Sequence, residues 1–193
     1  VDLSGVKTGG ILSVTLSSNY KLLNGYIVGP FVNLTDADLS GVDMGGMDLN
    51  GADLTGANLT NITSGGIIGS PILSYEYRLI IGGYIIGPSV DLTGADLSGL
   101  DLIGLDLTNV NLTNITSGSI TSYTLQTLQT LTDHYIVSNG YIVGPNVDLT
   151  GADLSGAIMT TADLTGIDLT GANLTNIISG LIIGSSYTLP IGY

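Results

Sequence analysis

The sequence predicts an all-β solenoid, chiefly because a five-residue phrase recurs along it. From Gly51 the chain reads Gly-Ala-Asp-Leu-Thr and then Gly-Ala-Asn-Leu-Thr, and variants of this phrase return in three separate blocks. An α-helix aligns apolar residues about every 3.6 positions and a flat strand about every two, so neither accommodates this period on one face. A coil of short strands joined by regular corners does accommodate it.

Each position in the phrase has its own physical role. The residue before Asp or Asn and the Leu after it both face inward, because side chains alternate along an extended segment. The polar residue between them then faces outward. A glycine in the fifth place, such as Gly41 or Gly56, suits a corner that needs a positive φ. The predicted core stacks Ala37, Ala52, Ala95 and Ala152 with Leu39, Leu54, Leu97 and Leu154.

The phrase resembles the A-[DN]-L-x-x motif of the pentapeptide-repeat proteins. It recurs in tandem in three arrays, approximately 32–61, 90–114 and 147–176, and only Ala157-Ile158-Met159 lacks Asp or Asn in the outward slot. The resemblance implies a right-handed, four-sided β-helix with about four phrases, or about 20 residues, in each coil. Coils would stack at the inter-strand spacing of roughly 4.8 Å, which makes residues about 20 apart vertical neighbours.

A longer repeat is superimposed on the short one. The phrase Gly-Tyr-Ile-Val/Ile-Gly-Pro occurs three times, with spacings of 58 and 57 residues. Its copies begin at Gly25, Gly83 and Gly140. In the connectors between arrays, Ile62, Ile67 and Ile72 keep the five-residue step. We interpret the connectors as degenerate coils with larger inward residues and small bulges, which predicts one continuous β-solenoid over residues 1–193.

Both ends of the sequence fall within the longer repeat. The segment 6–9 aligns with 62–65, and the last residues, 187–193, align with 20–26. An unfinished coil exposes backbone N–H and C=O groups to which another chain can add. We therefore expect either a window from a longer repetitive chain or copies that self-associate head to tail. The second arrangement is a heterologous contact that does not close, and it produces a filament.

The charge balance excludes several classes of partner. The chain has 3 Lys and Arg against 16 Asp and Glu, giving a net charge of −13. Thirteen of the 16 acids stand in the outward slot of the phrase. Such a surface lacks the basic patch that binds nucleic acid or an anionic membrane. No apolar run of membrane-spanning length occurs without Gly, Ser or Thr. We expect no nucleic-acid partner and no membrane span.

Stacking brings the outward carboxylates close together. Two like charges about 5 Å apart in a water-like dielectric repel by about 1 kcal/mol. Each array closes on an Asn whose amide is placed to donate to an Asp 20 residues earlier. The pairs are Asn58 with Asp38, Asn111 with Asp91 and Asn173 with Asp153. No calcium-binding loop pattern is present. We predict a solvated acidic face without a metal site, and coils that acid bundles without unfolding.

Catalytic candidates are scarce. His134 is the single histidine, beside Asp133, and the chain has no Cys. Adjacent residues on an extended chain point apart, and no third partner accompanies this pair, so it is not a convincing acid–base site. The sequence predicts neither enzyme activity nor a bound cofactor.

Six Asn-x-Thr sequons are candidate N-glycosylation sites. They lie at Asn33, Asn58, Asn61, Asn111, Asn114 and Asn173. A solenoid turns them outward, where a secretory pathway would attach glycans. A repeat that places Asn before Leu-Thr also creates this sequon automatically, so the pattern by itself does not decide whether the sites are used.

Three functions from different classes remain open. We favour a structural, extracellular or cell-surface β-solenoid that forms a fibre or filament, with a cytoplasmic location as the alternative. The second is an acidic DNA mimic that binds a type II topoisomerase, as the resemblance implies for one subgroup. That subgroup favours Phe in the central slot, whereas this chain has one Phe. The third is an ice-binding solenoid, suggested by the Thr after Leu but disfavoured by Asp on the same face.

Overall fold

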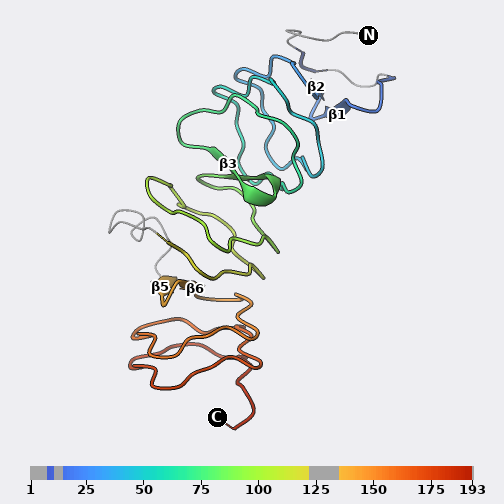
Figure 1. Cartoon of the computed structure of the whole chain (residues 1–193). Helices are drawn as coiled ribbons and strands as arrows, with labels where there is room; N and C mark the ends of the chain where they lie inside the picture. Colours follow the sequence, from blue (N-terminus) through green and yellow to red (C-terminus); the bar gives the residue numbers. More distant parts are fainter. Residues whose placement is uncertain (1–7, 11–14, 122–134, 193) are drawn as a thin grey trace. The chain divides into compact units, whose positions relative to one another are not determined.

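The protein consists of stacked coils without an α-helix in the described residues. The computed structural model describes residues 8–10, 15–121 and 135–192. These residues belong to two compact units, Val1–Asp91 and Leu92–Tyr193 (Figure 1). The His134 pair and the terminal residues Val1 and Tyr193 lie outside the described part. No helix within the described part is long and apolar enough to cross a membrane.

The coils of each unit are joined by parallel β-bridges between outward residues 20 positions apart. Asn33 pairs with Asp53 in the first unit, and Asp148 pairs with Asp168 in the second. Backbone hydrogen bonds follow the same direction, since the Leu34 N–H donates to the Asp53 carbonyl at 2.7 Å. The predicted coil length of about 20 residues and the stacking of residues 20 apart are therefore confirmed.

The corners between the short strands are tight four-residue turns. The Val42 N–H donates to the Leu39 carbonyl at 3.2 Å, across Ser40 and Gly41. Gly41 has a φ of +68°, a conformation that glycine adopts without a steric penalty. The fifth place of the phrase is thus occupied by glycine for the predicted reason.

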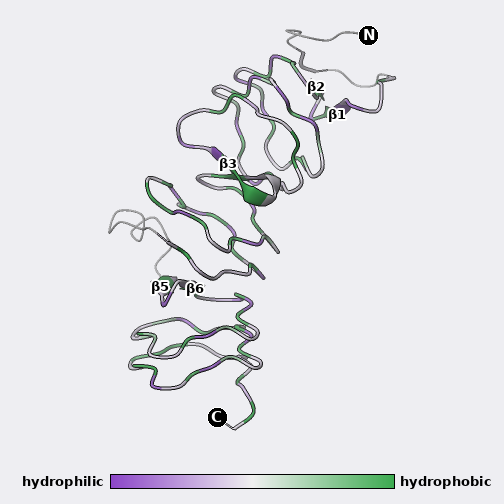
Figure 2. Ribbon diagram, in the orientation of Figure 1, coloured by the Kyte–Doolittle hydropathy of each residue, from purple (hydrophilic) through white to green (hydrophobic). Residues whose placement is uncertain are grey.

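The core is the predicted stack of inward residues. Ala95 and Leu97 are 0% and 2% exposed, while Asp96 between them is exposed. Figure 2 shows apolar and polar residues interspersed along the coils. Burying one Leu contributes about 1.5–3 kcal/mol before conformational entropy is subtracted, so repeated layers of Leu and Ala can stabilise a coil this narrow.

The connectors contain antiparallel hairpins, which the interpretation as degenerate coils did not predict. The strands are β1 (Lys21–Leu23) with β2 (Tyr26–Val28), β3 (Arg78–Ile80) with β4 (Tyr84–Ile86), and β5 (Ile136–Ser138) with β6 (Tyr141–Val143). The short 3-10 helix η1 (Ile81–Gly83) joins β3 to β4. Asn24-Gly25 and Asn139-Gly140 have positive φ at both positions, as two-residue hairpin turns require.

The predicted five-residue step fails at Ile72. This residue bridges Asp53 and is 54% exposed, so it occupies the outward slot and not the core. A shift of one residue moves a side chain to the opposite face of a strand, which explains the reversal. The ladder resumes beyond each internal hairpin, since Asp91 bridges Thr63 and Asp148 bridges Thr116. The hairpins are therefore insertions that the coils carry.

Candidate functional site

The outward carboxylates hold the corners of the coils. Asp53 Oδ1 accepts a hydrogen bond from the Thr55 N–H at 3.0 Å. This local bond, in which a side chain satisfies the backbone two residues later, is favoured by both Asp and Asn. Asn58 Oδ1 accepts from the Thr60 N–H in the same way, at 3.1 Å. The same bond to residue i+2 recurs at Asp38, Asp43, Asp48, Asp96, Asp101, Asp106, Asp148, Asp153, Asp163 and Asp168.

Asn side chains relieve the like charges between coils at two of the three predicted places. Asn58 Nδ2 donates to Asp38 Oδ1 at 3.1 Å, and Asn173 Nδ2 donates to Asp153 Oδ1 at 3.0 Å. Both predicted bonds are confirmed. At the third place Asn111 Nδ2 donates to Thr93 Oγ1 at 3.0 Å. A hydroxyl two residues beyond Asp91 thus receives the amide that was predicted to reach the carboxylate.

The corner bonds shift the titration of the carboxylates. The pKa values of Asp38, Asp96 and Asp153 lie below the ordinary Asp value because a Ser hydroxyl two residues later, and then its backbone N–H, donate to the charged form. For Asp53 and Asp168 a Thr supplies the same two donors and lowers the pKa in the same direction. The expectation that acid leaves the coils folded was therefore based on a wrong premise, because titrating groups hold the corners.

We expect the free energy of unfolding to fall as the pH drops below about 4. Unfolded Asp titrates near pH 3.9, roughly, and the folded pKa values are lower, so the unfolded state binds more protons in this interval. The stabilisation is complete above the unfolded pKa and is lost as the pH falls through the folded pKa values. Thermal melts followed by circular dichroism between about pH 5 and pH 2.5 measure it. A melting temperature that holds steady or rises towards acid would contradict the corner role of the carboxylates.

Asn58→Asp tests the amide bond between coils. The substitution keeps the corner bond of residue 58 but replaces a donor to Asp38 with a second negative charge, so we expect the melting temperature at neutral pH to fall by about 4–8 °C. Asn61→Asp is the matched control, because Asn61 lies at an exposed corner of the same array. Equal melting temperatures for the two variants would show that the bond between coils contributes nothing.

The six sequon residues occupy two different environments. The amide nitrogens of Asn58, Asn111 and Asn173 donate within the ladder, and Asn33 is half-buried, with its Oδ1 accepting from Thr35. Asn61 and Asn114 instead occupy corners, with φ of +56° and +55°, and are exposed. The structure does not gather the six residues into one patch. Asn61 and Asn114 are the two whose side chains are best placed to carry a glycan without losing a ladder bond.

The acidic face offers no evident place for a cation. Across residues 8–10, 15–121 and 135–192, no three His, Cys, Asp or Glu side chains are grouped as metal ligands. The carboxylates stand in single columns, and each accepts hydrogen bonds from its own corner.

A second feature, missed by sequence reasoning, is the way the coils receive the hairpins. Ser64 Oγ accepts a hydrogen bond from the Ile85 N–H at 3.0 Å, and a Cβ added to Gly65 would lie 2.9 Å from the Tyr84 ring. We call such a Ser/Thr-Gly pair, with the residue after it, a hairpin seat. The seats 8–10 and 117–119 repeat the arrangement with Ile27 and Tyr26, and with Ile142 and Tyr141.

A Tyr before each hairpin packs against the Gly of the Gly-Pro pair after it. Tyr20, Tyr77 and Tyr135 lie so close to Gly29, Gly87 and Gly144 that no Cβ fits at these glycines. The Tyr135 hydroxyl donates to the Pro145 carbonyl at 3.1 Å. Burial also raises the pKa of Tyr135, with a smaller contribution from the negative charge of Asp163. This packing gives a physical reason for the repeated Gly-Tyr-Ile-Val/Ile-Gly-Pro phrase.

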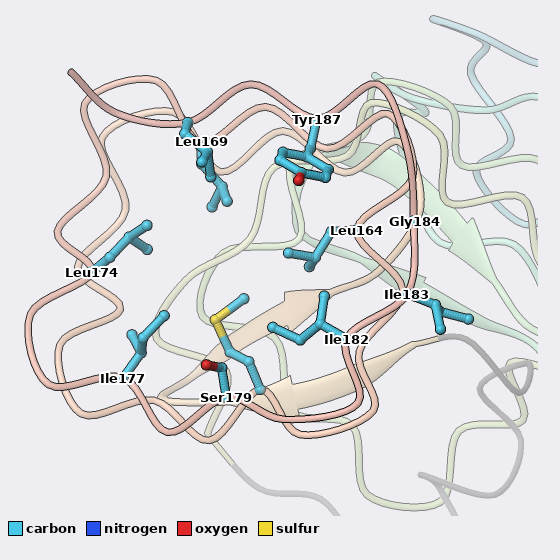
Figure 3. Close-up of a pocket in the computed structure, with 11 residues that line it drawn as sticks. Leu164, Leu169, Leu174, Ile177, Ser179, Ile182, Ile183, Gly184 and Tyr187 are labelled. Atoms are coloured by element: carbon cyan, nitrogen blue, oxygen red, sulfur yellow. The ribbon is translucent and has the colours of Figure 1, made fainter. Parts of the chain in front are cut away.

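The coil formed by residues 177–191 presents core residues to an open cavity. The cavity has a volume of about 300 Å³ and is lined mainly by apolar side chains. In Figure 3, Leu164, Leu169 and Leu174 point into this interior, whereas Ile183 points away from it. Leu181 is 82% exposed.

The five-residue phrase and the stacked coils agree with the comparison to known families. The family model described as pentapeptide repeats matches eight copies, over residues 32–63, 89–114 and 146–176. The chain belongs to the pentapeptide-repeat family. Its fold is accordingly a right-handed β-solenoid. Pentapeptide-repeat proteins are generally non-enzymatic structural or protein-interaction scaffolds, and nothing in the described residues shows catalytic activity.

One solved structure similar to this pentapeptide-repeat protein is HetL, from the cyanobacterium Nostoc sp. strain PCC 7120. HetL is a pentapeptide repeat protein involved in heterocyst differentiation regulation. The two are 23% identical over 86% of this chain, with a TM-score of 0.27. The match spans 65% of HetL, which is less than two thirds of its length. No curated protein matches the chain.

Proposed function

We propose that this pentapeptide-repeat protein is a structural scaffold that assembles head to tail, copy upon copy, outside the cell or at its surface. The observation that carries the proposal is the apolar face of the coil 177–191. Its cavity of about 300 Å³ is lined by the same Leu and Ile residues that form the core in the coils before it. Covering this face would extend the core by one further layer.

A second copy has the right chemistry for that cover. A coil of the same phrase brings inward Leu and Ala residues at the stacking distance of roughly 4.8 Å, together with backbone donors and acceptors for the next bridges. Each large apolar side chain buried in this way contributes about 1.5–3 kcal/mol before entropic costs. Because the covering and covered surfaces differ, the contact is heterologous and continues into an open filament.

The acidic faces favour stacking over lateral contact. Asp columns run along the sides of the coils, and the chain carries a net charge of −13. Like charges on the sides repel neighbouring filaments, whereas the coil 177–191 presents mostly apolar residues. Association should therefore proceed at the ends of a stack in low salt and spread to the sides as salt screens the repulsion.

Two features support a location outside the cell. The chain contains only 3 Lys and Arg residues, so trypsin-like proteases find few cleavage sites. The sequons at Asn61 and Asn114 are exposed and lie outside the ladder bonds. Mass spectrometry of the native protein tests this part of the proposal. Glycans at these two residues would support it, whereas cytoplasmic recovery of a protein without glycans would contradict it.

Sedimentation velocity over a concentration series tests the assembly. We expect the weight-average sedimentation coefficient to rise continuously with protein concentration at low salt, without a plateau at a dimer, because an open heterologous contact sets no upper size. A single species of 19.7 kDa at every concentration would contradict the proposal. Inhibition of DNA supercoiling by that single species would instead favour the DNA-mimic alternative.

A further inference from the structure

The chain carries a fourth hairpin seat, at residues 179–181, on the open coil. Ser179-Gly180 repeats the Ser-Gly pair of the seats at 64–66 and 117–119. Leu181 has a φ of +53°, close to the φ of +52° that Ser119 adopts in its occupied seat. A Cβ added to Gly180 would meet nothing within 4 Å, so no hairpin of the described residues lies on this seat.

The groups that bind a hairpin elsewhere face solvent at this seat. In an occupied seat the Ile120 N–H donates to the Gly140 carbonyl of the hairpin turn at 2.9 Å, and Ile120 is 6% exposed. Its counterpart here is Ile182, which is only half-buried and, within the described residues, donates to no hairpin turn. Ser179, whose counterparts accept a hairpin N–H, is exposed. The seat thus keeps its donor, its acceptor and its apolar floor.

The seat is formed before anything binds to it. Leu181 holds a left-handed conformation that is unfavourable for a residue with a branched side chain, so the surrounding coil must maintain it. The Gly180 carbonyl accepts a hydrogen bond from the Thr161 N–H at 2.8 Å, and Ile178 bridges Ile158 in the preceding coil. A preformed site spares an incoming hairpin much of the entropic cost of ordering its partner.

We propose that the seat 179–181 binds the β1–β2 hairpin of a second copy. This inference rests on the proposed head-to-tail assembly and names the contact that makes it. The hairpin carries Tyr26 and Ile27, the residue types that fill the other seats. The exchange transfers it from the seat 8–10 of its own chain to the equivalent seat of a neighbour, as in domain swapping.

Two internal junctions show what would follow the hairpin. After β3–β4, Asp91 bridges Thr63, and the Asp91 N–H donates to the Ile62 carbonyl at 2.9 Å. After β5–β6, Asp148 bridges Thr116 in the same way. These two hairpins are fixed between coils by the bridges on either side. The β1–β2 hairpin leads into the first array, so in the exchanged contact Asn33 of the second copy becomes the bridge partner of Ile178.

Gly180→Val is the variant that tests the contact. Valine fits the free seat without a clash and Gly180 has no positive φ, so the variant should fold and melt like the parent. In occupied seats a Cβ comes within 3.2 Å or less of the Tyr ring, so valine prevents docking. Thr160→Val, 20 residues earlier on the same side of the coil and exposed, is the matched control.

The readout is the protein concentration at which assembly begins, measured by sedimentation and by negative-stain imaging. We expect Gly180→Val to raise this concentration by about tenfold or more, as overpacking at a contact does, and Thr160→Val to leave it within about twofold. Because the variant keeps an intact β1–β2 hairpin, it should also add to the end of a parental filament and stop its growth. Small amounts of Gly180→Val mixed with the parent should therefore shorten the filaments.

The outcomes separate this contact from assembly in general. If the parent assembles and Gly180→Val assembles equally well, the seat contact is wrong while head-to-tail assembly stands. If the variant fails to assemble but does not shorten parental filaments, the second copy's hairpin is not the occupant and the inference is also overturned. If the parent itself does not assemble at any concentration, both the proposed function and the inference fall.

Discussion

Replacing Leu97 with Asp should unfold the coils around it, with a loss of at least about 4 kcal/mol in the free energy of unfolding of the second unit. Leu97 is 2% exposed in the stacked core, and its N–H donates to the Thr116 carbonyl at 2.9 Å. A carboxylate there has no partner, and the Leu layer above and below it is lost. Urea unfolding followed by circular dichroism measures the change.

Ser98→Asp is the control for this prediction. Ser98 is the next residue along the chain and is exposed, so a charge there is solvated and the cost should stay within about 1 kcal/mol. Equal losses for the two variants would contradict the inward register of the phrase, since that register alone distinguishes the two positions.

Gly87→Val should detach the β3–β4 hairpin, lowering the free energy of unfolding of the first unit by about 3 kcal/mol. A Cβ at this position would overlap the Tyr77 ring and would lie 2.7 Å from the Glu76 carbonyl oxygen. The ring can rotate away, but the backbone carbonyl cannot move without disturbing the hairpin. Hydrogen exchange should show faster exchange at the amides of β3 and β4, together with a lower melting temperature.

Gly180→Val provides the comparison, because the same substitution there meets nothing within 4 Å. Protein at concentrations below assembly should melt as the parent does. If both valine variants leave melting and hydrogen exchange unchanged, close packing of Tyr77 against Gly87 is not what holds the hairpin.

The coil could be predicted from the sequence because every signal for it is local. The alternation around Asp96 assigns Ala95 and Leu97 to the core, and the fifth-place glycines mark the corners. The hairpins were missed although Asn24-Gly25 and Asn139-Gly140 are strong two-residue turn signals with apolar residues on both sides. The five-residue period was extended across the connectors, where turn chemistry should have been given greater weight.

The site could be predicted only in part. A spacing of 20 residues correctly paired Asn58 with Asp38 and Asn173 with Asp153, because vertical neighbours follow from the period. The corner bonds of the carboxylates depend on the turn geometry and were not anticipated. The hairpin seats could not be recognised either, since a Ser-Gly pair is common and its role depends on a Tyr that follows many residues later.

The central claim is that copies of this chain stack end to end through the coil 177–191, and electron cryo-microscopy of assembled protein tests it most directly. We predict filaments one coil wide, in which the bridge spacing of roughly 4.8 Å continues across each junction and Ile178 of one copy faces Asn33 of the next. Discrete particles, or filaments joined through their acidic sides with the coil 177–191 left open to solvent, would contradict it.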